Sequence, residues 1–172
     1  MYQRTALAIA IILAGPSCAV ASTATINFHS STTTWLDAYS RAANIPPLRK
    51  SPRPELRVWI LDGKSGRVVG YSVSETVAVA CQTHQSTVGD TVTIEPANCR
   101  PVSHPHRMRA ALRQLNDLYA LDGKELDCGV MDGDLVYIEG VFRRHRFALW
   151  ADNPNLCRDP ASGLITKVLS LL

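Results

Sequence analysis

The stretch LRVWILDGKSGRVVGYSVS, residues 56–74, decides the fold class that the sequence predicts. Two runs rich in β-branched and aromatic residues flank the dipeptide Asp62-Gly63, and Gly66 offers another position for a positive φ. Such runs on either side of turn residues are typical of a β-hairpin with a loop of about four to six residues. The segment therefore predicts two antiparallel strands.

Further strands are expected along the chain. Thr76–Gln82 (TVAVACQ) predicts a third strand, the polar segment 84–89 predicts a turn, and the alternating DTVTIE of Asp90–Glu95 predicts a fourth strand. Nearer the C-terminus, residues 135–141 and 146–151 predict a second hairpin. Because the strands are mostly joined by short turns, the sheet is expected to be mainly antiparallel.

Three segments predict helices, because their apolar residues recur at helical spacing. The first is Trp35–Ala43, with Thr33 or Thr34 as its cap. The second, which shows the clearest pattern, is Ser103–Leu121. The third follows Asp159-Pro160, an N-cap residue with proline at the first helical position, and runs to the C-terminus.

This order of elements predicts an α+β fold: a single small domain, stapled by disulfides, with a mainly antiparallel sheet of about five to six strands and two to three helices gathered against one face. Residues 22–55 are expected to form an N-terminal lead-in with a short helix and a proline-rich connection. Within it, the Ser- and Thr-rich residues 22–34 are expected to be extended or loose. Residues 56–172 are expected to form the globular α+β domain.

The N-terminus has the pattern of a secretory signal peptide. Arg4 precedes a nearly apolar run, residues 6–14, and Gly15-Pro16 interrupts that run before small residues that end at Ala21. Residues 1–21 are therefore predicted to be removed after export, which places the mature protein in the periplasm of a bacterium or outside the cell. The apolar run is about half of the roughly 20 residues that a spanning helix needs, so no transmembrane segment is expected.

Lipid attachment at Cys18 is the alternative fate of the N-terminus. A bacterial lipoprotein is cleaved just before a cysteine, which then carries the lipid. Here Pro16 and Gly15 stand where small and then aliphatic residues are usual. We therefore favour loss of Cys18 with the signal peptide.

The other four cysteines predict two disulfides, since export leads to an oxidising compartment. No pair has the C-x-x-C spacing of a zinc or redox site. Four cysteines allow three connectivities. We expect Cys81–Cys99 and Cys128–Cys157, because each pair closes a local segment with one predicted hairpin or turn.

The net charge of the chain limits the classes of partner that it can bind. Its 18 basic and 15 acidic residues give a net charge of +3, which is too small for a dedicated nucleic-acid binder. The densest positive run is Arg143, Arg144, His145 and Arg146, at the predicted tip of the second hairpin. At a hairpin tip such a run is usually solvated charge; the alternative is contact with another protein, with neighbouring aromatic residues as anchors.

The start of the second predicted helix offers a weaker candidate, an anion site. Ser103 has N-cap chemistry, and Arg107 follows near the first turn, where backbone N–H groups attract anions. His104 and His106 share that turn, but residues two apart on a helix point to different sides. A helical metal pair needs a spacing of three or four, so no metal site is expected.

The remaining polar motifs are expected to be structural. Asp132-Gly133-Asp134 lacks the further ligands of a calcium loop, and Gly70–Ser74 lacks the last glycine of a nucleophile elbow. Glu139 lies among apolar residues, where burial would raise its pKa and suit it to act as an acid. Pairing with Arg146 across the hairpin is the favoured alternative. The sequence therefore assigns no catalytic, cofactor-binding or metal-binding residue.

Two classes of function remain. The favoured one is a small exported binding protein without enzymatic activity: an inhibitor, an immunity-type protein or an accessory protein that acts through contact with another protein. The alternative is a small exported hydrolase or lyase with a histidine–carboxylate site. Its candidate residues are His104, His106, His145, Asp132, Asp134 and Glu139. Two of these histidines and a carboxylate in one cleft would favour the enzyme.

Overall fold

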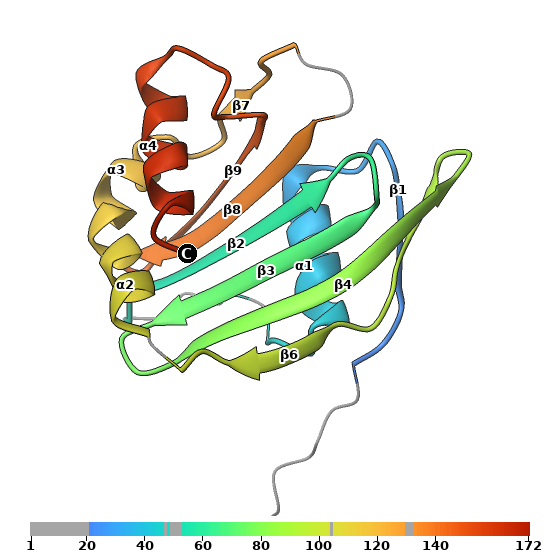
Figure 1. The fold of residues 1–172 in the computed structure, drawn as a ribbon, viewed down its shortest axis with the longest axis horizontal. Coiled ribbons are helices and arrows are strands. Elements are labelled where there is room, and N and C mark those ends of the chain that lie inside the picture. The colour runs from blue at the N-terminus through green and yellow to red at the C-terminus, as the bar shows by residue number, and fades with distance from the viewer. Residues whose placement is uncertain (1–20, 47, 49–52, 104, 130–132) are drawn as a thin grey trace, which may run out of the picture.

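The computed structural model describes residues 21–46, 48, 53–103, 105–129 and 133–172 (Figure 1). They form an α+β fold around one mixed, curled sheet. The strand order is β1-β5-β4-β3-β2-β8-β9-β7, and β6 pairs with β4 outside that path. Cys18 and residues 1–20 of the predicted signal peptide lie outside the described residues.

The elements have the following bounds. The strands are β1 (Ala24–Asn27), β2 (Glu55–Asp62), β3 (Arg67–Ser74), β4 (Ala78–Val88), β5 (Thr91–Ile94), β6 (Asn98–Pro101), β7 (Glu125–Leu126), β8 (Asp134–Phe142) and β9 (His145–Asp152). The helical elements are α1 (Thr32–Ala42), α2 (Pro105–Arg109), the 3₁₀ helix η1 (Ala110–Gln114), α3 (Leu115–Tyr119) and α4 (Pro160–Leu169). Since α2, η1 and α3 follow one another directly, the described chain has three helical segments.

The predicted sheet of about five to six mainly antiparallel strands is too small, and the sheet is mixed because one of its pairings is parallel. The sheet has nine strands among the described residues, and β7 pairs with β9 in parallel. The missed strands β1, β6 and β7 contain only two to four residues each, too few to show an alternating pattern. The polar segment 84–89 is mostly not a turn either, because β4 continues to Val88 and pairs with β5 there.

The helices cover both faces of the sheet, not one face as predicted (Figure 1). Alternate residues of the central strand β2 point to opposite sides. Trp59 and Leu61 belong to a core with α1, whereas Leu56 and Val58 belong to a core with η1, α3 and α4. A strand that is covered on both faces typically has a nearly continuous apolar sequence, as β2 does.

Side-chain caps define where two of the helices begin. Ser31 caps α1 and accepts a hydrogen bond from the Thr34 amide at 3.4 Å, so the cap lies before the predicted Thr33 or Thr34. Asp159 caps α4 with Pro160 at the first helical position, as predicted.

Both predicted disulfides are present. Cys81 on β4 and Cys99 on β6 are directly opposed in the sheet, with their Cα atoms 4.0 Å apart. Cys128, after β7, pairs with Cys157, before α4, with a Cα–Cα distance of 5.6 Å. None of the described helices is both long and apolar enough to cross a membrane.

Candidate functional site

The turn between β8 and β9 has an unusual backbone. Phe142 pairs with His145, so Arg143 and Arg144 alone form a two-residue turn. Their φ angles are +49° and +68°. Two successive positive φ angles define a type I′ turn, which ordinarily uses Asn-Gly because glycine and asparagine tolerate that region. Two arginines occupy it here.

The side chains around this turn form an exposed patch, which we call the hairpin tip: Tyr119, Phe142, Arg143, Arg144 and His145. Arg143 lies over the Phe142 ring, 5.0 Å from its centroid. The Tyr119 ring is 5.9 Å from Phe142 and 6.4 Å from His145. Neither arginine of the turn makes an ion pair within the described part of the chain. The tip therefore presents free positive charge beside aromatic rings.

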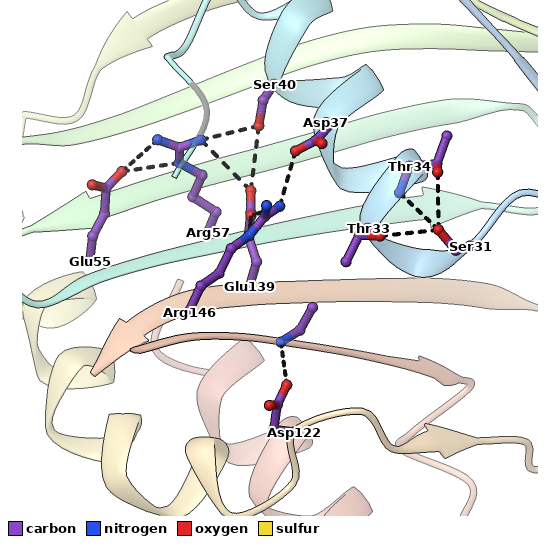
Figure 2. Close-up of polar contacts among 11 residues, drawn as sticks. Ser31, Thr33, Thr34, Asp37, Ser40, Glu55, Arg57, Asp122, Glu139 and Arg146 are labelled. Atoms are coloured by element: carbon purple, nitrogen blue, oxygen red, sulfur yellow. Dashed lines mark hydrogen bonds and ion pairs between the residues drawn. The ribbon is translucent and has the colours of Figure 1, made fainter. Parts of the chain in front are cut away.

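Arg146, the last residue of the predicted contact run, points elsewhere (Figure 2). Its Nη2 lies 2.8 Å from Glu139 Oε2 and 3.0 Å from Asp37 Oδ1. The predicted pairing of Glu139 with Arg146 is thus present. The structure divides the positive run, since three residues stay at the exposed tip and the fourth turns under α1.

Glu139 is the centre of a polar network between α1 and the sheet (Figure 2). Its Oε1 accepts a hydrogen bond from Ser40 on α1 and lies 3.7 Å from Nη1 of Arg57. Arg57 also donates to Glu55 at 2.8 Å. Burial raises the pKa of Glu139, whereas the guanidiniums of Arg57 and Arg146 act in the opposite direction. The side chain of Glu139 is only 1% exposed, so the network anchors α1 and is poorly placed to act as an acid on a substrate.

The histidines and carboxylates of the enzyme alternative are not assembled. His145 and Asp134 occupy opposite ends of the β8–β9 hairpin. His106 lies on α2, and His104 and Asp132 are outside the described residues. No three His, Cys, Asp or Glu side chains of the described chain are placed to hold a metal ion.

The candidate anion site at the start of α2 stays a prediction. Nη2 of Arg107 donates to the carbonyl oxygen of Ser170 at 2.6 Å, beyond the last residue of α4. Ser103 is exposed and precedes a helix of only five residues. In this conformation Arg107 donates to a carbonyl that has no partner within the helix, and its positive charge is favourable beside the negative end of the helix dipole.

A cavity that the sequence analysis missed opens beside the start of α1. Its volume is about 570 Å³, within the range of small-molecule sites. The residues around it come from the β1–α1 connection and from α1, β2, β4, β7, β8 and β9. Aromatic side chains that are far apart in sequence meet there, namely Phe28, Trp35, Tyr137 and Trp150. Hydrophobic patterns within single elements do not indicate such a cluster, because its members come from different elements.

No protein-family model matches this chain, and no curated protein is similar enough in sequence to indicate a common origin. The case for a function therefore rests on the hairpin tip and the cavity. They lie at opposite ends of β8, because Leu135 borders the cavity and Phe142 precedes the turn. This separation along the strand is about 20–25 Å.

Proposed function

We propose that this protein is an exported, non-enzymatic binding protein that contacts an acidic surface of another protein through the hairpin tip. The observation that supports this proposal is the pair of arginines at positive φ. A side chain larger than glycine costs about 1–2 kcal/mol in this region. Strained residues of this kind concentrate where side chains take part in binding or catalysis.

The chemistry of the tip favours carboxylates. A guanidinium binds a carboxylate in a planar, two-pronged arrangement, and Arg143 and Arg144 have no carboxylate of their own among the described residues. Tyr119, 36% exposed, and Phe142 add aromatic surface beside the charges. Aromatic and arginine side chains dominate the energy of many protein interfaces. An inhibitor, an immunity-type protein or an accessory subunit would each use such a patch.

The turn itself provides the test. The double variant Arg143→Asn/Arg144→Gly replaces the strained pair with the preferred type I′ sequence, so the hairpin is retained while both charges are removed. The matched control is Lys64→Asn/Arg67→Asn, which removes two exposed charges from the β2–β3 hairpin. Tagged mature protein is mixed with envelope extract of the source organism, and captured proteins are identified by mass spectrometry.

We expect the wild type and the control to capture the same acidic protein and the tip variant to lose it. The purified partner should then bind the wild type with an affinity that falls as salt rises. A partner that the tip variant binds as well as the wild type does, or that has no acidic surface, would contradict the proposal. So would a wild-type protein that captures nothing.

A further inference from the structure

The cavity beside α1 is built from rings and from polar groups that lack partners, and it is independent of the hairpin tip. Trp35 and Tyr137 stack with their ring centroids 5.7 Å apart, and Phe28 meets Trp35 edge-on at 6.4 Å. Phe28 is 51% exposed and lies at the rim, whereas Trp35 and Tyr137 are buried. The aromatic wall therefore continues from solvent into the protein.

Three side chains on this wall, each from a residue that is mostly buried, have a polar atom without a hydrogen-bond partner in the described chain. Oε1 of Gln85 accepts from the Tyr39 hydroxyl at 2.7 Å, but the amide nitrogen of Gln85 has no acceptor. The hydroxyl of Tyr137 and the indole N–H of Trp35 also lack partners there. Gln85 and Tyr137 are only 8% and 7% exposed. The fully enclosed unpaired side-chain atoms of the described chain are Trp59 Nε1 and Arg109 Nε, so the three atoms on this wall are open to water and available to a ligand.

The unused groups are mostly donors. The amide nitrogen of Gln85 and the indole N–H of Trp35 can only donate. Burial raises the pKa of Tyr137 to about 12, so its hydroxyl keeps its proton at neutral pH and can donate as well as accept. A purely apolar ligand would leave all three groups unpaired. A ligand with oxygen atoms could accept hydrogen bonds from these donors in place of water.

The charges around the cavity argue against an anionic ligand. No lysine or arginine is among its lining residues within the described chain, and Glu125 contributes a carboxylate. A phosphate or sulfate would find no lysine or arginine to bind, with the exposed His29 as the one lining residue of the described chain that can become cationic, and it would be repelled by that carboxylate. Neutral hydroxyl groups fit better, since they accept from the buried donors and donate to Glu125 or to the serine and threonine hydroxyls at the start of α1.

We propose that this cavity binds a neutral saccharide of one or two rings. The apolar C–H faces of a sugar ring pack against the aromatic side chains, with Phe28 and the half-buried Trp150 reachable from solvent. The sugar hydroxyls satisfy Gln85, Tyr137 and Trp35. The volume of about 570 Å³ accommodates a ligand of this size. The tip and the cavity would then serve different ligands.

The variant Tyr137→Phe tests this proposal with little effect on the fold. It removes only a hydroxyl that has no partner in the described chain, and it keeps the ring that stacks on Trp35. The control is Tyr119→Phe, which makes the same change at the hairpin tip. A second variant, Phe28→Ala, removes an exposed ring from the rim of the cavity.

The mature protein is titrated with glucose, galactose, mannose, N-acetylglucosamine, cellobiose and chitobiose. Tryptophan fluorescence and saturation-transfer NMR report the binding. We expect at least one saccharide to bind and Tyr137→Phe to weaken it about tenfold, the effect of one lost hydrogen bond. Phe28→Ala should weaken the same saccharide, whereas Tyr119→Phe and the tip variant Arg143→Asn/Arg144→Gly should bind it as the wild type does.

Tetramethylammonium and decanoate serve as probes for the competing chemistries. Binding of either probe in the cavity without binding of any saccharide would overturn the proposal. So would a saccharide whose affinity is unchanged in both Tyr137→Phe and Phe28→Ala, because it would then bind elsewhere. Since the tip variant is expected to keep saccharide binding and to lose the protein partner, failure of this proposal can be told from failure of the proposed function.

Discussion

At the scale of single residues, Glu139 shows how this protein holds charge in its interior (Figure 2). Its carboxylate lies between two guanidiniums, and each of these also contacts a second carboxylate: Arg57 with Glu55 and Arg146 with Asp37. A charge removed from water is tolerated only where it is paired and hydrogen-bonded. The network satisfies that condition from three elements of the fold, α1, β2 and the β8–β9 hairpin.

The first prediction concerns Arg57, which is almost completely buried. We expect Arg57→Met to lower the free energy of unfolding by about 3 kcal/mol or more, because Glu55 and Glu139 lose a shared partner. Glu139→Gln should cost less, since Arg57 keeps Glu55 and Arg146 keeps Asp37. Urea denaturation measures both values. A larger loss in Glu139→Gln than in Arg57→Met would contradict this order.

The second prediction concerns the pH dependence of the same carboxyl. Because burial raises the pKa of Glu139 in the folded protein, the folded state binds its proton more readily than the unfolded state does. The contribution of Glu139 to stability therefore increases as the pH falls toward the ordinary value of a glutamate and decreases as the pH rises through the folded pKa. Denaturation of the wild type and of Glu139→Gln at several pH values gives the contribution of Glu139 by difference.

We expect the wild type to gain stability relative to Glu139→Gln as the pH is lowered from neutral. The comparison is needed because Asp62 and Asp159 have pKa values lowered by hydrogen bonds from Ser65 and Ser162, so they lose stabilising contributions in acid. These two groups are present in both proteins and cancel. A relative loss of the wild type at low pH would show that the two arginines outweigh burial.

At the scale of secondary-structure elements, the β8–β9 turn yields the third prediction. We expect Arg143→Asn/Arg144→Gly to raise the free energy of unfolding by about 1 kcal/mol, because the variant removes backbone strain at two positive φ angles. Two smaller effects act in the opposite direction: the lost stacking of Arg143 on Phe142 and the added freedom of glycine in the unfolded chain. Thermal and urea unfolding measure this effect without any partner. A destabilised double variant would mean that the arginines support the hairpin and are not strained.

Elements with a strong local pattern could be predicted from the sequence, and those defined by their neighbours could not. The hairpin of residues 56–74, the β8–β9 pairing and the cap at Asp159 depend on nearby residues, and the structure contains all three. Strand β7 is different, because two residues become a strand only by lying beside β9. The nearly continuous apolar sequence of β2 could have predicted that helices cover both faces of the sheet.

At the scale of the whole molecule, the cavity could not be predicted because its wall joins residues from most of the chain. Phe28 follows β1, Gln85 lies on β4, and Trp150 lies on β9. Each has a local role that explains it without a ligand: an exposed ring, a polar strand residue, and a half-buried strand aromatic. Only their meeting, with polar atoms left unpaired, indicates a site. The two disulfides were predictable because each closes a short segment of the chain.

The fourth prediction concerns the region that the disulfide Cys128–Cys157 holds together. Strand β7 has only two residues paired with β9, and this disulfide connects the segment after β7 to the start of α4. Removing it with Cys128→Ala/Cys157→Ala should lower the free energy of unfolding by about 3 kcal/mol, the cost that chain entropy assigns to a loop of this size. Because β7 pairs with β9 through only two residues, the β7–β9 pairing should open first.

Hydrogen exchange can separate this local opening from the global loss of stability. The amide of Trp150 donates to the carbonyl of Lys124 at 3.2 Å, so its exchange reports the β7–β9 connection. The matched control is Cys81→Ala/Cys99→Ala, whose loop is of similar length, with a sequence separation of 18 between the cysteines against 29. Both variants should lose comparable global stability, since loop entropy depends only on the logarithm of length. Only Cys128→Ala/Cys157→Ala should speed hydrogen exchange at the Trp150 amide by more than its loss of global stability explains. Equal acceleration in both variants would show that β7 is held by the sheet alone.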